Sequence, residues 1–155
     1  MSYYIQVALS EPIHTAVVRG RVRPQDLAQF VPAACGEVWS FVRSANLPRP
    51  GRHCALYLDD HEAVEVGLEV TAPFVGNDRV HCSRLPEGRV LTTVHFGPYS
   101  LLWEAHTAIH RWCAEQKYQL SGISWELYDH WQESWNVDSS KIRTDVFHLL
   151  RGELG

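Results

Sequence analysis

The chain has 155 residues, with 14 Lys and Arg against 18 Asp and Glu, so its formal net charge is −4. Apolar residues make up 45% and charged residues 21%, a globular composition that fits one ordinary domain and not a disordered chain. The mildly acidic charge without a basic run argues against direct binding to nucleic acid, and no apolar stretch reaches the roughly 18 residues of a membrane helix.

The chain begins with two predicted strands, at residues 3–8 and 13–20, followed by a helix from about Pro24 to Ala45. Within that helix, apolar residues recur at steps of three and four, the pattern of one buried stripe. Pro24 suits the first helical turn. Pro32 lies inside the pattern and indicates either a kink or a late start of the helix.

Four more strands are expected after this helix. The apolar run from Cys54 to Leu58 predicts one, and a turn at Asp59-Asp60-His61 joins it to the alternating strand from Val64 to Val70. Residues 79–84 and 89–96 form the next two. Gly97-Pro98 then opens a second helix, expected from about Tyr99 to Lys117.

The last two strands are predicted at Ser124 to Tyr128 and Thr144 to Leu150, joined by a polar loop around residues 136–140. The sum is about eight strands and two helices. We expect an α+β fold, in which a mostly antiparallel sheet carries both helices on one face.

The two halves of the chain resemble each other. Leu9-Ser10-Glu11-Pro12 returns as Leu85-Pro86-Glu87-Gly88, 76 residues on, and the strand ending at Gly20 returns as the one ending at Gly97, 77 residues on. This period indicates a duplicated strand-helix-strand-strand module, with repeats at about residues 1–76 and 77–155 of a single domain. A groove between the two helices would then lie near the pseudo-twofold axis.

The four cysteines lie far apart, without a Cys-x-x-Cys pair, which argues against a disulfide framework or a zinc ribbon. Because the N-terminus also lacks a secretory pattern, we expect a cytoplasmic protein. His106 and His110 have the spacing of metal ligands on a helix, but no third ligand follows, and solvated surface is the simpler interpretation. No metal or cofactor is expected.

One segment carries an acid among aromatic residues. In a strand, Ser124, Glu126 and Tyr128 share one face, and Trp125 points the other way. If the face of Glu126 meets the helices, a buried carboxylate lies beside a tyrosine, where it could attract a cation or transfer a proton. If Trp125 packs under the helices instead, Glu126 lies in solvent. The alternation leaves both arrangements open.

A second segment runs from a strand into a helix, Val94-His95-Phe96-Gly97-Pro98-Tyr99. Tyr99, at the first helical turn, either overhangs the groove or packs at the helix start. Six Trp, six Tyr and five Phe are more aromatic residues than packing in a domain of this size requires, so an aromatic-lined site is expected.

At these residues the chain resembles the GyrI-like small-molecule-binding domain, also called the bacterial transcription-activator effector-binding domain. The resemblance spans nearly the whole chain. Its strongest motifs, in order, are His95-x-Gly97-Pro98-Tyr99-x-x-Leu102-x-x-Ala105, Gly122-x-x-Trp125-Glu126-x-Tyr128 and Ile142-Arg143-Thr144-Asp145-Val146-Phe147.

The resemblance implies the duplicated fold and an aromatic-lined ligand groove, with a glutamate rising from the sheet at the position of Glu126. It therefore favours the arrangement in which Glu126 faces the helices. The expected ligand-binding residues are Glu126, Tyr128, Tyr99, Trp103, Trp39, Phe147 and His95. Of these, Trp103 and Trp39 rest on helix geometry and not on a motif.

Relatives in this family are often fused to a DNA-binding helix-turn-helix domain, for which this chain has no residues left, so a stand-alone member is expected. Its expected function is to bind or sequester hydrophobic, aromatic or cationic small molecules. Two alternatives remain: a hydrolase of reactive, cyclopropane-type electrophiles that uses Glu126 and Tyr128, and a protein that interacts with a macromolecule such as gyrase.

Overall fold

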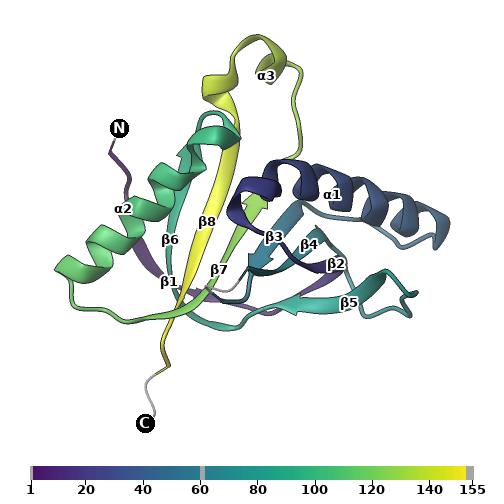
Figure 1. Cartoon of the computed structure of the whole chain (residues 1–155), viewed down its shortest axis with the longest axis horizontal. Helices are drawn as coiled ribbons and strands as arrows, with labels where there is room; N and C mark the ends of the chain where they lie inside the picture. The colour runs from purple at the N-terminus through teal and green to yellow at the C-terminus, as the bar shows by residue number, and fades with distance from the viewer. Residues whose placement is uncertain (1, 60–61, 153–155) are drawn as a thin grey trace.

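The chain forms one antiparallel sheet with two main helices on one face (Figure 1). The computed structural model describes residues 2–59 and 62–152. The sheet order is β1-β6-β8-β7-β3-β4-β2-β5, and the predicted α+β class is confirmed. The described strands are β1 (Gln6–Ser10), β2 (Ile13–Arg21), β3 (His53–Tyr57), β4 (Ala63–Glu69), β5 (Val80–Leu85), β6 (Gly88–Phe96), β7 (Leu120–Tyr128) and β8 (Arg143–Leu150).

Each main helix begins with a short 3-10 turn. Pro24–Asp26 precedes α1 (Leu27–Ser44), and Tyr99–Leu101 precedes α2 (Leu102–Glu115). Both predicted helices are therefore present, and Pro32 lies inside α1 without ending it. None of the described helices is long and apolar enough to cross a membrane.

The two connections around the last strands differ from the sequence expectation. β7 begins at Leu120, four residues before the predicted start, because an irregularity near Gly122 lets the strand continue toward α2. The polar loop before β8 contains a short helix, α3 (Ser134–Val137), and a 3-10 turn at Ser139–Lys141. Of the predicted turn at Asp59-Asp60-His61, the last two residues lie outside the described part of the chain.

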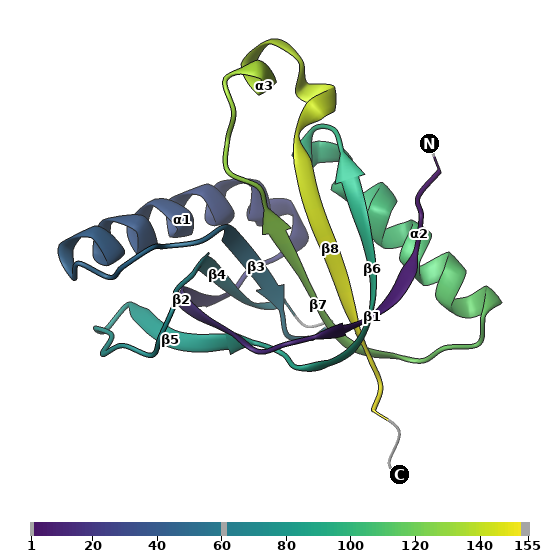
Figure 2. The same cartoon turned by 180° about the vertical axis from the view of Figure 1, so that it is seen from behind.

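The two helices cover different strands and leave the middle of the sheet open. α1 packs on β2 and β4, and α2 packs on β6 and β8. The central strands β3 and β7 lie between the strands that α1 covers and the strands that α2 covers, as Figures 1 and 2 show from opposite sides. Each helix has its own apolar core, centred on Val38 in the first half and on Ile109 in the second.

The other face of the sheet has a third core. Trp125 is 1% exposed and stacks on Phe147, with ring centroids 5.4 Å apart. Leu85 of β5, the last strand in the sheet order, and Val90 of β6, the second strand, join the same cluster. They come together because β1 pairs with β6 and β2 pairs with β5 in one continuous register, with Ser10 opposite Gly88 and Ile13 opposite Leu85. The curled sheet therefore gives Trp125 a buried place away from the helices.

The element order strand-strand-helix-strand-strand occurs twice, and the two halves meet at the centre of the sheet. Ala55 of β3 pairs with Glu126 of β7, and Tyr57 and Tyr128 lie two residues beyond these on their strands. A twofold axis through the Ala55–Glu126 pair would exchange the two tyrosines.

The same exchange relates positions further out. Leu68 faces His53 across β3 and β4, and His148 faces Ser124 across β7 and β8, so Leu68 and His148 are equivalent. Aligning the starts of α1 and α2 makes Val31 and Cys35 the equivalents of His106 and His110. These correspondences identify, for a position in one half, the residue at the equivalent position in the other half.

Candidate functional site

A groove of about 1530 Å³ lies between the helices, over the central strands. Apolar and aromatic side chains form most of its wall. Among the described residues that line it are five histidines and three carboxylates but no Lys or Arg. Two of these carboxylates have other contacts: Asp129 lies 3.4 Å from Arg52, and Asp59 accepts the backbone N–H of Ala63. Glu126 is the carboxylate at the floor.

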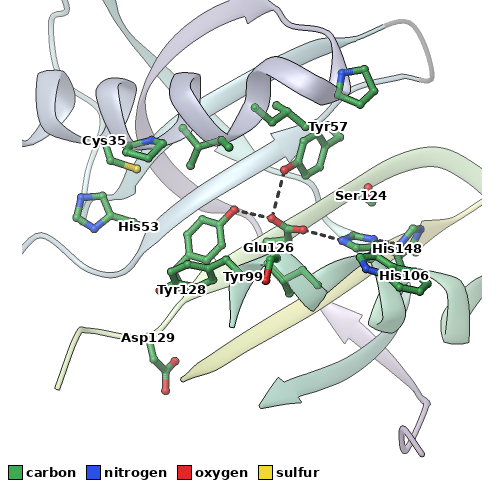
Figure 3. Close-up of a pocket in the computed structure, with 18 of the residues that line it drawn as sticks. Cys35, His53, Tyr57, Tyr99, His106, Ser124, Glu126, Tyr128, Asp129 and His148 are labelled. Atoms are coloured by element: carbon green, nitrogen blue, oxygen red, sulfur yellow. Dashed lines mark hydrogen bonds and ion pairs between the residues drawn. The ribbon is translucent and has the colours of Figure 1, made fainter. Parts of the chain in front are cut away.

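Glu126 is 5% exposed and faces the helices, so the structure selects one of the two arrangements that the sequence left open. Its Oε1 accepts the hydroxyl protons of Tyr128 at 2.5 Å and of Tyr57 at 3.2 Å. Its Oε2 lies 2.7 Å from Nε2 of His106. Figure 3 shows these three side chains directed at the carboxylate from β7, β3 and α2. A buried carboxylate with three partners is stabilised where an unpaired one would be costly.

The two tyrosines remain hydroxyl donors over the physiological pH range. Burial, and then the nearby charge of Glu126, raise the pKa of Tyr57 and hold the pKa of Tyr128 well above its ordinary value. The ring of Tyr99 meets the ring of Tyr128 edge to face at 5.5 Å, which fixes the Tyr128 ring from above.

His106 joins Glu126 to a second histidine. Its Nδ1 lies 2.8 Å from Nε2 of His148, a buried residue of β8. Burial, followed by the charges of His106 and His110, lowers the pKa of His148 from 6.5 to about 3, so His148 is neutral at physiological pH. The prediction that His106 is solvated surface is therefore wrong: its side chain is 22% exposed and points into the groove.

Three histidines lie close together on this side of the groove: His106, His110 and His148. His110 is exposed and contacts the ring of His148 edge on, with centroids 5.1 Å apart. Across the described residues, no group of three or more His, Cys, Asp or Glu is arranged to hold a metal ion. The close approach of His106 and His148 is a hydrogen bond between ring nitrogens.

Five of the seven expected ligand-binding residues line the groove: Glu126, Tyr128, Tyr99, Trp103 and Trp39. Trp103 is 61% exposed and Trp39 42%, so both rings are available at the mouth. The other two lie elsewhere. Phe147 is on the opposite face of the sheet, because residues of β8 alternate and His148 takes the groove side.

His95 is also outside the groove. It is 1% exposed, and its ring nitrogens contact the hydroxyl of Tyr3 at 2.9 Å and the carbonyl of Pro98 at 3.1 Å. These contacts hold the end of β6 against the start of α2 and so help to place Tyr99. The expectation that Phe147 and His95 form part of the groove wall does not hold.

Three residues of the hydrogen-bonded set around Glu126 were not found from the sequence: Tyr57, His106 and, through His106, His148. One signal could have found His106, because Tyr99, Trp103, His106 and His110 follow one another at steps of four, three and four and so share one helix face. Tyr57 and His148 depend on strand register, which no local pattern specifies.

The arrangement leaves Glu126 with limited capacity for a new hydrogen bond. A carboxylate offers about four lone-pair positions, and the tyrosines and His106 occupy three of them. One position on Oε2 remains. Glu126 can therefore present a negative charge to a ligand that lies between the aromatic walls of the groove. Alternatively, its Oε2 can accept one more hydrogen bond, from a water or an N–H group.

Comparison with known proteins identifies the family of this chain. Residues 5–151 match the family described as the GyrI-like small molecule binding domain. The search of curated proteins gave no match.

Several solved structures share the fold at low sequence identity. The C-terminal domain of EcmrR has a TM-score of 0.76 at 18% identity, and the match covers 97% of this chain and 99% of that one. SAV2435 bound to tetraphenylphosphonium has a TM-score of 0.66 at 15% identity, over 98% and 95% of the two chains. A hydrolase from Listeria innocua has a TM-score of 0.59 at 12% identity, over 95% and 91%.

Proposed function

Because this chain belongs to the family of GyrI-like small-molecule-binding domains, we propose that it binds hydrophobic aromatic ligands, above all cations, in the groove over Glu126. In this role the chain is a binding or sequestering protein. The observation that carries the proposal is a carboxylate, 5% exposed, at the floor of a groove lined without Lys or Arg among the described residues.

The physical reason is the combination of one charge with many apolar contacts. Burial of a ligand's apolar surface supplies most of the affinity, and the aromatic faces of Trp39, Trp103 and Tyr99 can add cation–π attraction. Glu126 then favours a positive ligand over a neutral one of the same shape, because a charge interacts strongly in a site that excludes water. The likeness to SAV2435, whose structure holds tetraphenylphosphonium, supports the choice of ligand class.

The test is binding of tetraphenylphosphonium and of the uncharged triphenylphosphine oxide, followed by tryptophan fluorescence and thermal unfolding. For Glu126→Gln we expect about 10- to 100-fold weaker binding of the cation, with less than about threefold change for the oxide, since only the charge is removed. Glu65→Gln is the matched control, because Glu65 is also a buried glutamate but binds Ser83 and Arg19 and does not line the groove. Equal loss of both ligands in Glu126→Gln would contradict the proposed role of the charge.

A hydrolase is the second candidate, and the hydrogen-bonded set around Glu126 favours it. In this function a water at the open position of Oε2 attacks an electrophilic ring carbon. A C–O bond forms, the strained C–C bond breaks, Glu126 takes the water proton, and Tyr128 protonates the departing carbon. Tyr128 regains its proton from Glu126. Glu126→Gln would then abolish turnover while the affinity for an uncharged substrate is retained.

If a panel of hydrophobic cations and electrophilic compounds changes neither the fluorescence nor the melting temperature, both proposals are wrong. That outcome would favour the third expectation, an interaction with a protein partner.

A further inference from the structure

Two ionisable side chains, Glu126 and His106, meet at the groove floor. Oε2 of Glu126 lies 2.7 Å from Nε2 of His106. An ionised carboxylate only accepts hydrogen bonds, so Nε2 of His106 donates to it. The proton on Nε2 is present in both the neutral and the charged imidazole. The state of His106 is therefore decided at its other ring nitrogen, Nδ1.

Nδ1 of His106 can gain a proton without any loss of hydrogen bonds. When His106 is neutral, Nδ1 accepts from Nε2 of His148 across 2.8 Å. When His106 is charged, Nδ1 donates across the same distance and His148 carries its proton on Nδ1 instead. Both states use the same atoms in the same places, so protonation of this pair requires no rearrangement of the groove floor.

A positive charge is better compensated at His106, which contacts the carboxylate, than at the more buried His148. His148 is 6% exposed and has its pKa lowered to about 3, which keeps it neutral. The side chain of His106 is 22% exposed and has the carboxylate as its neighbour, so a positive charge there is compensated at once.

The other described titratable groups that face His106 do not supply a negative charge to compensate a positive one on its ring. Tyr128 on β7 and Tyr57 on β3 stay neutral because burial raises the pKa of both. Across the groove on α1, burial raises the pKa of the Cys35 thiol to about 11. On its own helix, His110 is exposed and contacts the ring of His148.

We propose that His106 is the residue that determines the ligand charge accepted by the groove: neutral, it leaves the charge of Glu126 to a hydrophobic cation, and protonated, it cancels that charge and favours an uncharged aromatic ligand. This inference rests on the proposed binding function and deepens it. A cation beside Glu126 and a proton on His106 then disfavour each other, so binding of one cation releases up to one proton. Binding of a neutral ligand releases none.

Calorimetric titration with tetraphenylphosphonium and triphenylphosphine oxide, between pH 5.5 and 8.5 and in buffers of different ionisation enthalpy, measures both affinity and proton release. For the wild-type chain, we expect cation affinity to fall tenfold or more from pH 8 to pH 5.5. Linkage to one proton can change the affinity by up to tenfold per pH unit, so this pH range is wide enough for such a change. The affinity for the oxide should change less than about twofold.

His106→Gln tests the assignment to this residue. Glutamine can still donate to Glu126 but cannot become charged, so we expect cation affinity without pH dependence and without proton release. His81→Gln is the matched control, because His81 lies on β5 and does not line the groove, and it should behave as the wild type does.

The proposal is overturned if the wild-type chain binds the cation equally well at pH 5.5 and 8, or if His106→Gln keeps the wild-type slope. The first measurement needs no variant, so it stands even if His106→Gln does not fold. Both outcomes leave cation binding itself intact. If the wild-type chain binds neither probe at pH 8, the proposed function fails and this inference fails with it.

Discussion

The two halves of the molecule share one scaffold but present different chemistry to the groove. Where the second half has His106, Glu126 and His148, the first half has Val31, Ala55 and Leu68 at the equivalent positions. All three polar residues of one half are thus apolar in the other. A buried polar group is stable only when its partners are present, so the polar set is complete in one half and absent in the other.

The tyrosines are the exception to this difference. Tyr57 and Tyr128 are equivalent across the twofold axis, and both donate to the same oxygen of Glu126. The site therefore uses both halves, although its two hydrogen-bonded histidines, His106 and His148, come from the second. The comparison shows how a duplicated fold can keep a symmetric framework while the chemistry of the groove becomes asymmetric.

The largest effect on stability is expected when a histidine of the second half is introduced at the equivalent position of the first half. Leu68 is fully buried in the first core, and Leu68→His would place an imidazole there beside Val31 and Ala55, with no acid to pair with. The lost apolar burial and the unpaired polar group should lower the free energy of unfolding by about 3–5 kcal/mol. Urea unfolding at pH 7 measures it. A loss below about 1 kcal/mol would mean that the two halves tolerate the same chemistry.

The reverse substitution, His148→Leu, should change the pH dependence of stability. The pKa of His148 is lowered from 6.5 to about 3, so the unfolded chain binds this proton first. The contribution to stability is complete above pH 6.5 and is lost as the pH falls toward 3. At pH 4 the loss amounts to about 3 kcal/mol, and the variant should lack it. Urea unfolding at pH 7 and pH 4 compares the two proteins, and parallel acid losses would contradict the assignment.

The smallest effect separates the two equivalent tyrosines. Tyr128 donates to Glu126 at 2.5 Å and Tyr57 at 3.2 Å, so Tyr128→Phe should cost about 1–2 kcal/mol and Tyr57→Phe about half as much. Thermal unfolding of both variants at pH 7 provides the comparison. Equal losses would show that the hydroxyls act symmetrically despite their different distances.

Local pattern predicted much of the framework. The spacing of apolar residues placed both helices within a few residues of α1 and α2, and the alternation of Val64 to Val70 placed β4. The family motif pointed to Glu126, Tyr128 and Tyr99, which do line the groove. Such features depend on neighbours in the sequence, so the sequence carries them directly.

Phe147 and His95 show where local pattern was insufficient. Both lie in the motifs that carry the resemblance, yet Phe147 supports Trp125 on the other face and His95 holds the start of α2. A motif identifies residues that matter, but it does not say on which side of the sheet they lie, because one step along a strand reverses the face.

The sequence alone determined the order of strands and helices and the presence of an acid between aromatic residues, because propensity and periodicity act over a few residues. Tertiary structure decided that the curled sheet offers Trp125 a separate core, which turns Glu126 toward the helices. It also decided which side chains form the hydrogen-bonded set around that acid. Tyr57, His106 and His148 lie 69, 20 and 22 positions away in the chain, and only the packing of β3, α2 and β8 around β7 brings them within reach.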